Sequence, residues 1–236
     1  MPRALAIETS GRVGSIATLQ DGQVLVEEQF PHGLQHAAQI VAIIDRLTGA
    51  QRWGPADIQE LYVSAGPGSF TGLRIGITLA KTMALATGVK IVAVPTVRVL
   101  AENAPDEAKH LILVLDAKRE QIFTARFERT GEEWQEREPA HVERLMEILS
   151  RSHRPVHLLG EGIPFHRQFI PQSADVIVTD ESLWRPRAAA VAKVGYPLAR
   201  SGAFADPDRL TPIYIRRPEA EEKWEQLQAQ RTKSAS

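Results

Sequence analysis

The segment Ser64–Gly88 joins a glycine-rich turn to a long apolar stretch, SAGPGSFTGLRIGITLAKTMALATG. A turn of this kind at the start of a helix often binds a phosphate group. Pro67 between two glycines makes the turn rigid, and Ser69 or Thr71 can cap the helix that follows. The N–H groups at the positive end of that helix could then hold an anion. The alternative is that the glycines only let the helix pack closely on a sheet.

The two common nucleotide-binding patterns do not account for this turn. A Walker A loop ends in glycine, lysine and a hydroxyl residue, but Leu73 and Arg74 stand at the last two positions. A Rossmann turn needs a third glycine, and the chain has Thr71 there. The turn therefore matches neither a P-loop nor a dinucleotide-binding fingerprint.

Other catalytic chemistry has little support. The chain contains no cysteine, which excludes disulfides, thiol catalysis and cysteine-bound zinc. It has no G-x-S-x-G nucleophile elbow. His32 and His36 are four residues apart, the spacing of a helical metal pair, and a metallopeptidase would need both to bind zinc. Because Pro31 and Gly33 flank His32, we expect it to precede the helix, so packing at the helix entry is favoured and no metal site is predicted.

Composition predicts a globular protein with a sizeable core. The 236 residues are 43% hydrophobic, and the formal net charge is -1. This balance argues against the basic face of an autonomous nucleic-acid-binding protein, though not against contact with RNA inside a complex. The N-terminus enters an apolar strand without a charged leader, and no apolar run approaches the ~18 residues of a membrane span. We therefore expect a cytoplasmic protein with no membrane contact.

Periodicity places these motifs in an α/β fold. The first ~105 residues read as three strands, a helix over 34–47 ending near Gly49, and then strand, helix, strand and helix. The polar stretch APDEAKH is the expected domain boundary, after which LILVLDAKREQIFTARFE again reads as strand, turn and strand. The charged runs EEWQEREP and EAEEKWEQ are interpreted as solvated helix faces. We predict two lobes, 1–105 and 106–217, and a charged tail over 218–236 that is a candidate helix.

The helix predicted over 72–87 is apolar around most of its circumference. Such a helix is either buried on two sides or docks against a partner. Gly76, Ala80 and Ala84 recur every four positions and would let another helix approach closely. Burial under the second lobe and an intermolecular helix–helix contact are about equally favoured by the pattern alone.

Four segments together resemble the TsaB (YeaZ) family of partner subunits in tRNA threonylcarbamoyladenosine synthesis. They are ALAIETS, the histidine that opens the first helix, VSAGPGSFTGLRIGITLAKTMALATG and LDAKREQIF. The resemblance covers roughly the first 130 residues in order, and GPGSFTGLRIG is its most specific part. It implies a two-lobed actin-like ATPase fold (sugar kinase–Hsp70–actin), with a mixed sheet and flanking helices in each lobe.

The resemblance also implies a function. The chain would be a non-catalytic scaffold or activator subunit of the catalytic subunit TsaD, which transfers a threonylcarbamoyl group to the adenosine beside the anticodon. The ATPase TsaE would join them, tRNA would be met only within the complex, and the chain alone would form a homodimer. The implied docking surface comes from the first helix and the long apolar helix: Ala37, Ile40, Val41, Ile44, Phe70, Leu73, Arg74, Ile77, Ala80, Lys81 and Ala84.

In catalytic relatives two hairpins surround the phosphates of a nucleotide. Here Asp116 is followed by Ala117, Lys118 and Arg119 where small glycines would let a phosphate approach. We therefore expect no working cofactor in this subunit and at most degenerate ATP or ADP binding. The residues at the corresponding positions are Glu8, Thr9, Ser10, Gly66, Gly68 and Asp116. A small-molecule kinase or ATPase of the same fold is the alternative function.

Overall fold

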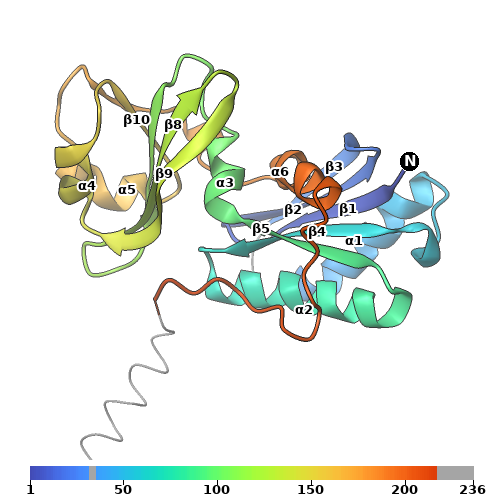
Figure 1. Cartoon of the computed structure of the whole chain (residues 1–236). Coiled ribbons are helices and arrows are strands. Elements are labelled where there is room, and N and C mark those ends of the chain that lie inside the picture. Colours follow the sequence, from blue (N-terminus) through green and yellow to red (C-terminus); the bar gives the residue numbers. More distant parts are fainter. Residues whose placement is uncertain (32–35, 217–236) are drawn as a thin grey trace, which may run out of the picture.

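The structure, a computed structural model, describes residues 1–31 and 36–216 and consists of two lobes (Figure 1). The first lobe is built on a five-stranded sheet with strand order β3-β2-β1-β4-β5. Its elements are β1 (Arg3–Glu8), β2 (Val13–Gln20), β3 (Gln23–Pro31), α1 (His36–Ala50), β4 (Glu60–Gly66), α2 (Phe70–Thr87), β5 (Lys90–Pro95) and α3 (Thr96–Ala101). The predicted order of three strands, a helix and alternating elements is confirmed, although α1 continues through Gly49.

Alternating side chains give this sheet two apolar faces. Leu5 and Ile7 of β1 point to the face that α1 and α2 cover, whereas Ala4 and Ala6 point to the opposite face. Strands β1 and β2 are antiparallel, while β1, β4 and β5 are parallel to one another. Strands buried on both faces carry near-continuous hydrophobic runs, which is the pattern of LYVSA and KIVAVP.

The second lobe repeats this topology. Strand β8 lies between β6 and β9 in antiparallel pairing, while β6, β10 and β11 are parallel. The order β9-β8-β6-β10-β11 therefore corresponds to β3-β2-β1-β4-β5, so the predicted echo of the first hairpin is confirmed. Its elements are β6 (His110–Leu113), β7 (Leu115–Asp116), β8 (Ile122–Thr130), β9 (Glu133–Glu143), α4 (Leu145–Arg151), β10 (Val156–Leu159), α5 (Ile163–His166) and β11 (Val176–Val178), with three short 3-10 helices at Pro55–Asp57, Arg167–Phe169 and Glu181–Leu183.

The predicted division between residues 105 and 106 is only partly right. The last helix of each half packs against the lobe formed by the other half. Helix α6 (Ala188–Arg200) lies on the first sheet, where its alanines meet Ala4, Ala6 and Tyr62. Helix α3 instead gives Val97 and Leu100 to the core of the second lobe. The chain then returns to the first lobe, where Ala205 forms a bridge with Ile91. The second lobe therefore ends before α6, and not at residue 217.

One segment that was predicted to be a solvated helix face is a β-strand instead. The run EEWQEREP belongs to β9, which pairs with β8 along its length. Its side chains alternate between exposed and half-buried, a period of two that the high charge hid from sequence reasoning. The tail predicted over 218–236 lies outside the described residues. Within the described parts of the chain, no helix has the length and apolarity needed to cross a membrane.

Gly195 of α6 packs closely on the first sheet, and together with Gly49 it allows a matched pair of predictions. A Cβ there would lie 2.8 Å from Cγ of the buried Tyr62. That ring is held at its far end, where its hydroxyl donates to Glu60 at 2.5 Å. A Cβ at Gly49 in α1 would meet nothing within 4 Å.

Alanine gains about 1 kcal/mol over glycine in a helix, whereas overpacking a core costs about 1–3 kcal/mol. We therefore expect Gly195→Ala to lower the free energy of unfolding by up to about 2 kcal/mol, and Gly49→Ala to raise it by up to about 1 kcal/mol. Urea denaturation of both variants checks this. Equal stabilisation by the two alanines would contradict the close approach of α6.

Candidate functional site

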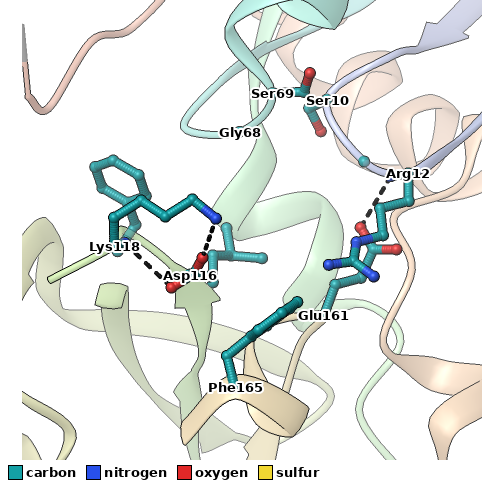
Figure 2. Close-up of a pocket in the computed structure, with 11 residues that line it drawn as sticks. Ser10, Arg12, Gly68, Ser69, Asp116, Lys118, Glu161 and Phe165 are labelled. Atoms are coloured by element: carbon teal, nitrogen blue, oxygen red, sulfur yellow. Dashed lines mark hydrogen bonds and ion pairs between the residues drawn. The ribbon is translucent and has the colours of Figure 1, made fainter. Parts of the chain in front are cut away.

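A cleft of about 460 Å³ opens where the turns of the two lobes face each other (Figure 2). Both walls are formed by connections that follow strands, the usual position of ligand sites in α/β folds. The lining residues are Ser10, Gly11, Arg12, Gly68, Ser69, Leu115, Asp116, Lys118, Phe123, Glu161 and Phe165. Of the residues predicted for a degenerate nucleotide site, the structure brings Ser10, Gly68 and Asp116 to this cleft.

The glycine-rich turn forms one wall by packing directly on the β1–β2 turn. The N–H of Ser69 donates to the carbonyl of Ser10 at 2.7 Å, and a Cβ on Gly68 would lie 2.6 Å from the same oxygen. Only glycine allows that approach. The hydroxyl of Ser69 accepts the N–H of Gly72 at 3.2 Å, so Ser69 is the cap of α2. The interpretation of these glycines as close-packing residues is therefore supported at Gly68.

On the opposite wall, the Asp116 carboxylate is bound by Lys118 of its own hairpin and by His166 of α5. The carboxylate lies 2.9 Å from Nζ of Lys118 and 3.2 Å from Nε2 of the buried His166. Burial opposes ionisation of Asp116, but the hydrogen bonds from Lys118 and His166 outweigh it and lower its pKa. Lys118, Arg119 and Glu120 all have φ between 53° and 63°, where residues with a Cβ are strained. The predicted bulky turn is therefore real.

Glu161 crosses the cleft from the second lobe and was not predicted. Its carboxylate accepts the N–H of Arg12 at 3.0 Å (Figure 2). It also lies 3.9 Å from the guanidinium of Arg185. The flanking glycines set its position, because a Cβ at Gly160 or Gly162 would press within 2.4–2.6 Å of the β6–β7 backbone. The sequence GEG after a strand was the signal that could have identified this residue.

The guanidinium of Arg12 also stacks over the ring of Phe165, 4.9 Å from its centroid. A nucleotide in this fold would place phosphate against the N–H groups of the β1–β2 turn. Here a carboxylate already accepts one of them, and a phosphate brought to that point would meet like charge. At the N–H of Arg12, the Glu161 carboxylate therefore stands where a bound anion would have to lie.

The other predicted nucleotide-site residues lie behind the cleft. Glu8 is 0% exposed, and its Oε1 accepts both the N–H of Ser10 at 2.5 Å and the Ser10 hydroxyl at 2.6 Å. Burial raises the pKa of Glu8 to about 7, although the hydrogen bonds from Ser10 act in the opposite direction. Thr9 is buried against Gly76 of α2, and Gly66 is buried at the end of β4 with φ of 113°. These residues hold the lobe together and do not line the cleft.

The predicted docking residues divide into two groups. Five of them are buried in the first lobe, and of these only Ile40 also lines the groove described next: Ile40, Ile44, Leu73, Ile77 and Ala80. Val41, Phe70 and Arg74 are exposed, while Lys81 and Ala84 are half-buried. The Nζ of Lys81 donates to the carbonyl of Leu210 at 3.3 Å. The side chain of Ala37 lies outside the described residues, as do His32 and the side chain of His36.

The outward side of α2 instead lines a shallow groove beside α1, with a volume of about 390 Å³. Its lining residues are Ile40, Arg74, Ile75, Thr78, Leu79 and Thr82. Sequence reasoning missed Ile75, Thr78, Leu79 and Thr82 because an almost wholly apolar helix does not reveal which stripe faces its own sheet. We call this surface the α1–α2 groove.

A cluster of rings and one cation continues the α1–α2 groove at the start of α2. The guanidinium of Arg74 lies 3.9 Å from the ring centroid of Phe70 and donates from Nε to the hydroxyl of Tyr214 at 3.0 Å. The rings of Phe70 and Tyr214 are 5.4 Å apart. All three side chains are at least partly exposed, which is characteristic of residues that anchor protein interfaces.

Comparison with known proteins places the chain in a family. The family model described as TsaD, tRNA N6-adenosine threonylcarbamoyltransferase, matches residues 33–224. The Bacillus subtilis tRNA threonylcarbamoyladenosine biosynthesis protein TsaB is 31% identical over 93% of this chain and 96% of its own length. The Escherichia coli TsaB is 26% identical over 91% of this chain and 94% of its own length.

Solved structures agree on the fold. The structure of YeaZ from Pseudomonas aeruginosa superposes with a TM-score of 0.76 at 22% identity, covering 91% of this chain and all of that one. With the duplicated sheets described above, these similarities establish that the chain belongs to the TsaB (YeaZ) family of tRNA threonylcarbamoyladenosine biosynthesis proteins.

Proposed function

We propose that this chain takes part in tRNA threonylcarbamoyladenosine synthesis as a non-catalytic partner subunit in the cytoplasm. Its role is to dock a TsaD-like catalytic subunit, which a TsaE-like ATPase then joins. The observation that carries this proposal is the α1–α2 groove, where Ile75 and Leu79 lie beside the exposed Thr78. In the absence of that partner, a second copy of the chain would occupy the same groove, so homodimer and heterodimer would compete.

The cleft supports an accessory role over the alternative of a kinase or ATPase. Asp116, the acidic residue of the second hairpin, is engaged by Lys118 and His166. The N–H of Arg12 in the first hairpin is engaged by Glu161. A phosphoryl-transfer site needs such groups free to hold metal and phosphate. tRNA would be bound within the complex, since the net charge of -1 provides no broad basic surface.

The proposal is tested with the TsaD-like and TsaE-like proteins of the same organism. We expect this chain to co-elute with the TsaD-like subunit in size-exclusion chromatography. Threonylcarbamoylation of tRNA should require all three proteins, and this chain alone should have no such activity. Full activity without this chain, or separate elution of the two subunits, would overturn the partner role.

The cleft gives a separate prediction about nucleotides. We expect the isolated chain to bind Mg-ATP no more tightly than about millimolar, because the Glu161 carboxylate occupies the phosphate side of the β1–β2 turn. Removing that charge in Glu161→Ala should strengthen ATP binding by about tenfold or more, equivalent to about 1.4 kcal/mol. Isothermal titration calorimetry of both proteins checks this. Micromolar binding by the unchanged chain that is lost in Ser10→Ala would favour the kinase or ATPase alternative.

A further inference from the structure

The second lobe carries a group of side chains of types that can bind a metal, and none of them lines the cleft or the α1–α2 groove. His110 begins β6, Glu128 lies opposite it on β8, and His153 follows α4. One ligand atom from each residue lies within 4.8 Å of the other two. We refer to these three residues as the His110 cluster. Two imidazoles and one carboxylate form a typical donor set for zinc.

The distances within the cluster suit a metal ion. Oε1 of Glu128 is 3.0 Å from Nδ1 of His153 and 3.7 Å from Nδ1 of His110. In a tetrahedral zinc site with bonds of about 2.0–2.2 Å, neighbouring ligand atoms are about 3.3 Å apart. The two separations bracket that value. The rings of His110 and His153 are nearly perpendicular, at 79°, with centroids 5.3 Å apart, so both can turn a nitrogen toward one point.

An unsatisfied nitrogen adds a second, independent observation. Nδ1 of His110 is shielded from solvent, yet it makes no hydrogen bond within the described parts of the chain. Burial of a polar atom without a partner is costly and calls for an explanation.

The surrounding charges determine how Glu128 is held. Arg137 donates from Nε to Oε2 of Glu128 at 2.8 Å, which leaves Oε1 turned toward the histidines. Nη1 of Arg126 is 3.3 Å from Oε1, but its Nε is anchored by Glu138 at 2.8 Å. An outer partner of this kind on a ligating carboxylate is common at metal sites because it fixes the orientation of the ligand.

A neighbouring group of possible metal ligands is already neutralised by an arginine side chain. Glu138, His141 and Glu143 also lie close enough to share a cation. There the guanidinium of Arg151 already contacts both carboxylates at 2.6 Å, and Nε2 of His141 meets Glu143 at 2.6 Å. A guanidinium therefore takes the position of a cation in that group. In the His110 cluster Arg126 reaches only Oε1 of Glu128, and Nδ1 of His110 has no hydrogen-bond partner among the described residues.

From this geometry we propose that the His110 cluster binds one zinc ion through Nδ1 of His110, Nδ1 of His153 and Oε1 of Glu128. A water molecule would complete the tetrahedron. The ion would tie the α4–β10 connection to the end of the second sheet at which β6 begins. Because Arg126 and Arg137 contact Glu128, binding is expected to be weaker than in structural sites with several thiolates. The hard cation Mg²⁺ prefers oxygen ligands and should not replace zinc.

The test uses the full chain without an affinity tag, stripped of metal, and titrated with zinc chloride against a chromophoric chelator. We expect one equivalent to bind and to raise the melting temperature, while magnesium does neither. His153→Ala should weaken zinc binding at least about tenfold and remove the thermal shift. The side chain of His153 is 69% exposed, so this variant should fold normally.

Two further variants make the assignment specific. His141→Ala removes the histidine of the neighbouring group and should leave zinc binding unchanged. The double variant His32→Ala/His36→Ala removes the other histidine pair of the sequence and should also bind as the unchanged chain does. No zinc binding by the unchanged chain, equal binding by His153→Ala, or loss of binding in either control would overturn the proposal.

Discussion

Glu8→Gln is expected to stabilise the protein above pH 7 and to have little effect near pH 4. Glu8 is fully buried at the end of β1, and burial raises its pKa from 4.5 to about 7. Its Oε1 has two donors from Ser10, whereas Oε2 is buried without a hydrogen bond within the described parts of the chain. Glutamine keeps the accepting oxygen and removes the charge, so the variant should escape the cost of burying a carboxylate.

The sign follows from proton linkage. Between pH 4.5 and about 7 the folded state binds more protons at Glu8 than the unfolded state does, so stability falls as pH rises through this window. A shift of about 2.5 pKa units corresponds to about 3 kcal/mol at 1.36 kcal/mol per unit. The destabilisation caused by burying the ionised Glu8 carboxylate is absent below pH 4.5, develops between pH 4.5 and 7, and remains constant at higher pH.

Urea unfolding at several pH values from 4 to 9 measures the effect as a difference between variant and unchanged chain, which cancels the titration of other groups. We expect the difference to grow from near zero to about 2–3 kcal/mol in favour of Glu8→Gln. Glu181→Gln, at a side chain that is 73% exposed, is the control and should give no such trend. A difference that is independent of pH would show that Glu8 does not titrate in this window.

Much of the fold was predictable because local patterns and tertiary packing agree. The strand–turn–strand openings of both halves, the cap at Ser69 and the helical run after it all appear where the sequence places them. Each rests on a short-range signal, such as a hairpin turn or a hydroxyl before an apolar run. The family motif GPGSFTGLRIG is likewise local, since Gly68 touches the β1–β2 turn directly.

The errors concern contacts between distant parts of the chain. Nothing in PRAAAVAKVGYPLAR states that α6 returns to the first sheet, because an alanine-rich helix would suit either core. The charged strand β9 was interpreted as helical since its charges mask a period of two. In the cleft, Glu161 and Arg12 are 149 residues apart in sequence, so their pairing depends wholly on how the lobes meet.

The sequence also does not show which side of α2 is exposed, and this matters for choosing a substitution that tests docking. Ala80 belongs to the docking surface expected from the sequence, but it is 0% exposed and packs in the core of the first lobe. A charge there would destabilise the lobe and leave docking untested. Thr78 is exposed in the middle of the α1–α2 groove, two residues away along the same helix. It is therefore the position at which docking can be changed while the fold is kept.

Thr78→Arg is expected to weaken association with a TsaD-like subunit on the order of 100-fold or more, since an unpaired charge buried in an apolar contact costs about 3–5 kcal/mol. Isothermal titration calorimetry measures the loss, and urea unfolding should show a change in stability within about 0.5 kcal/mol. Ser150→Arg places the same side chain on an exposed position of α4 in the second lobe and should bind normally. If Thr78→Arg bound the partner as tightly as Ser150→Arg, the partner would have to dock away from the α1–α2 groove, even if the two proteins still formed a complex. If only Thr78→Arg loses binding, the partner contacts the outer side of α2, where Thr78 lies with Ile75 and Leu79. This is the intermolecular contact that the apolar sequence of the helix suggests.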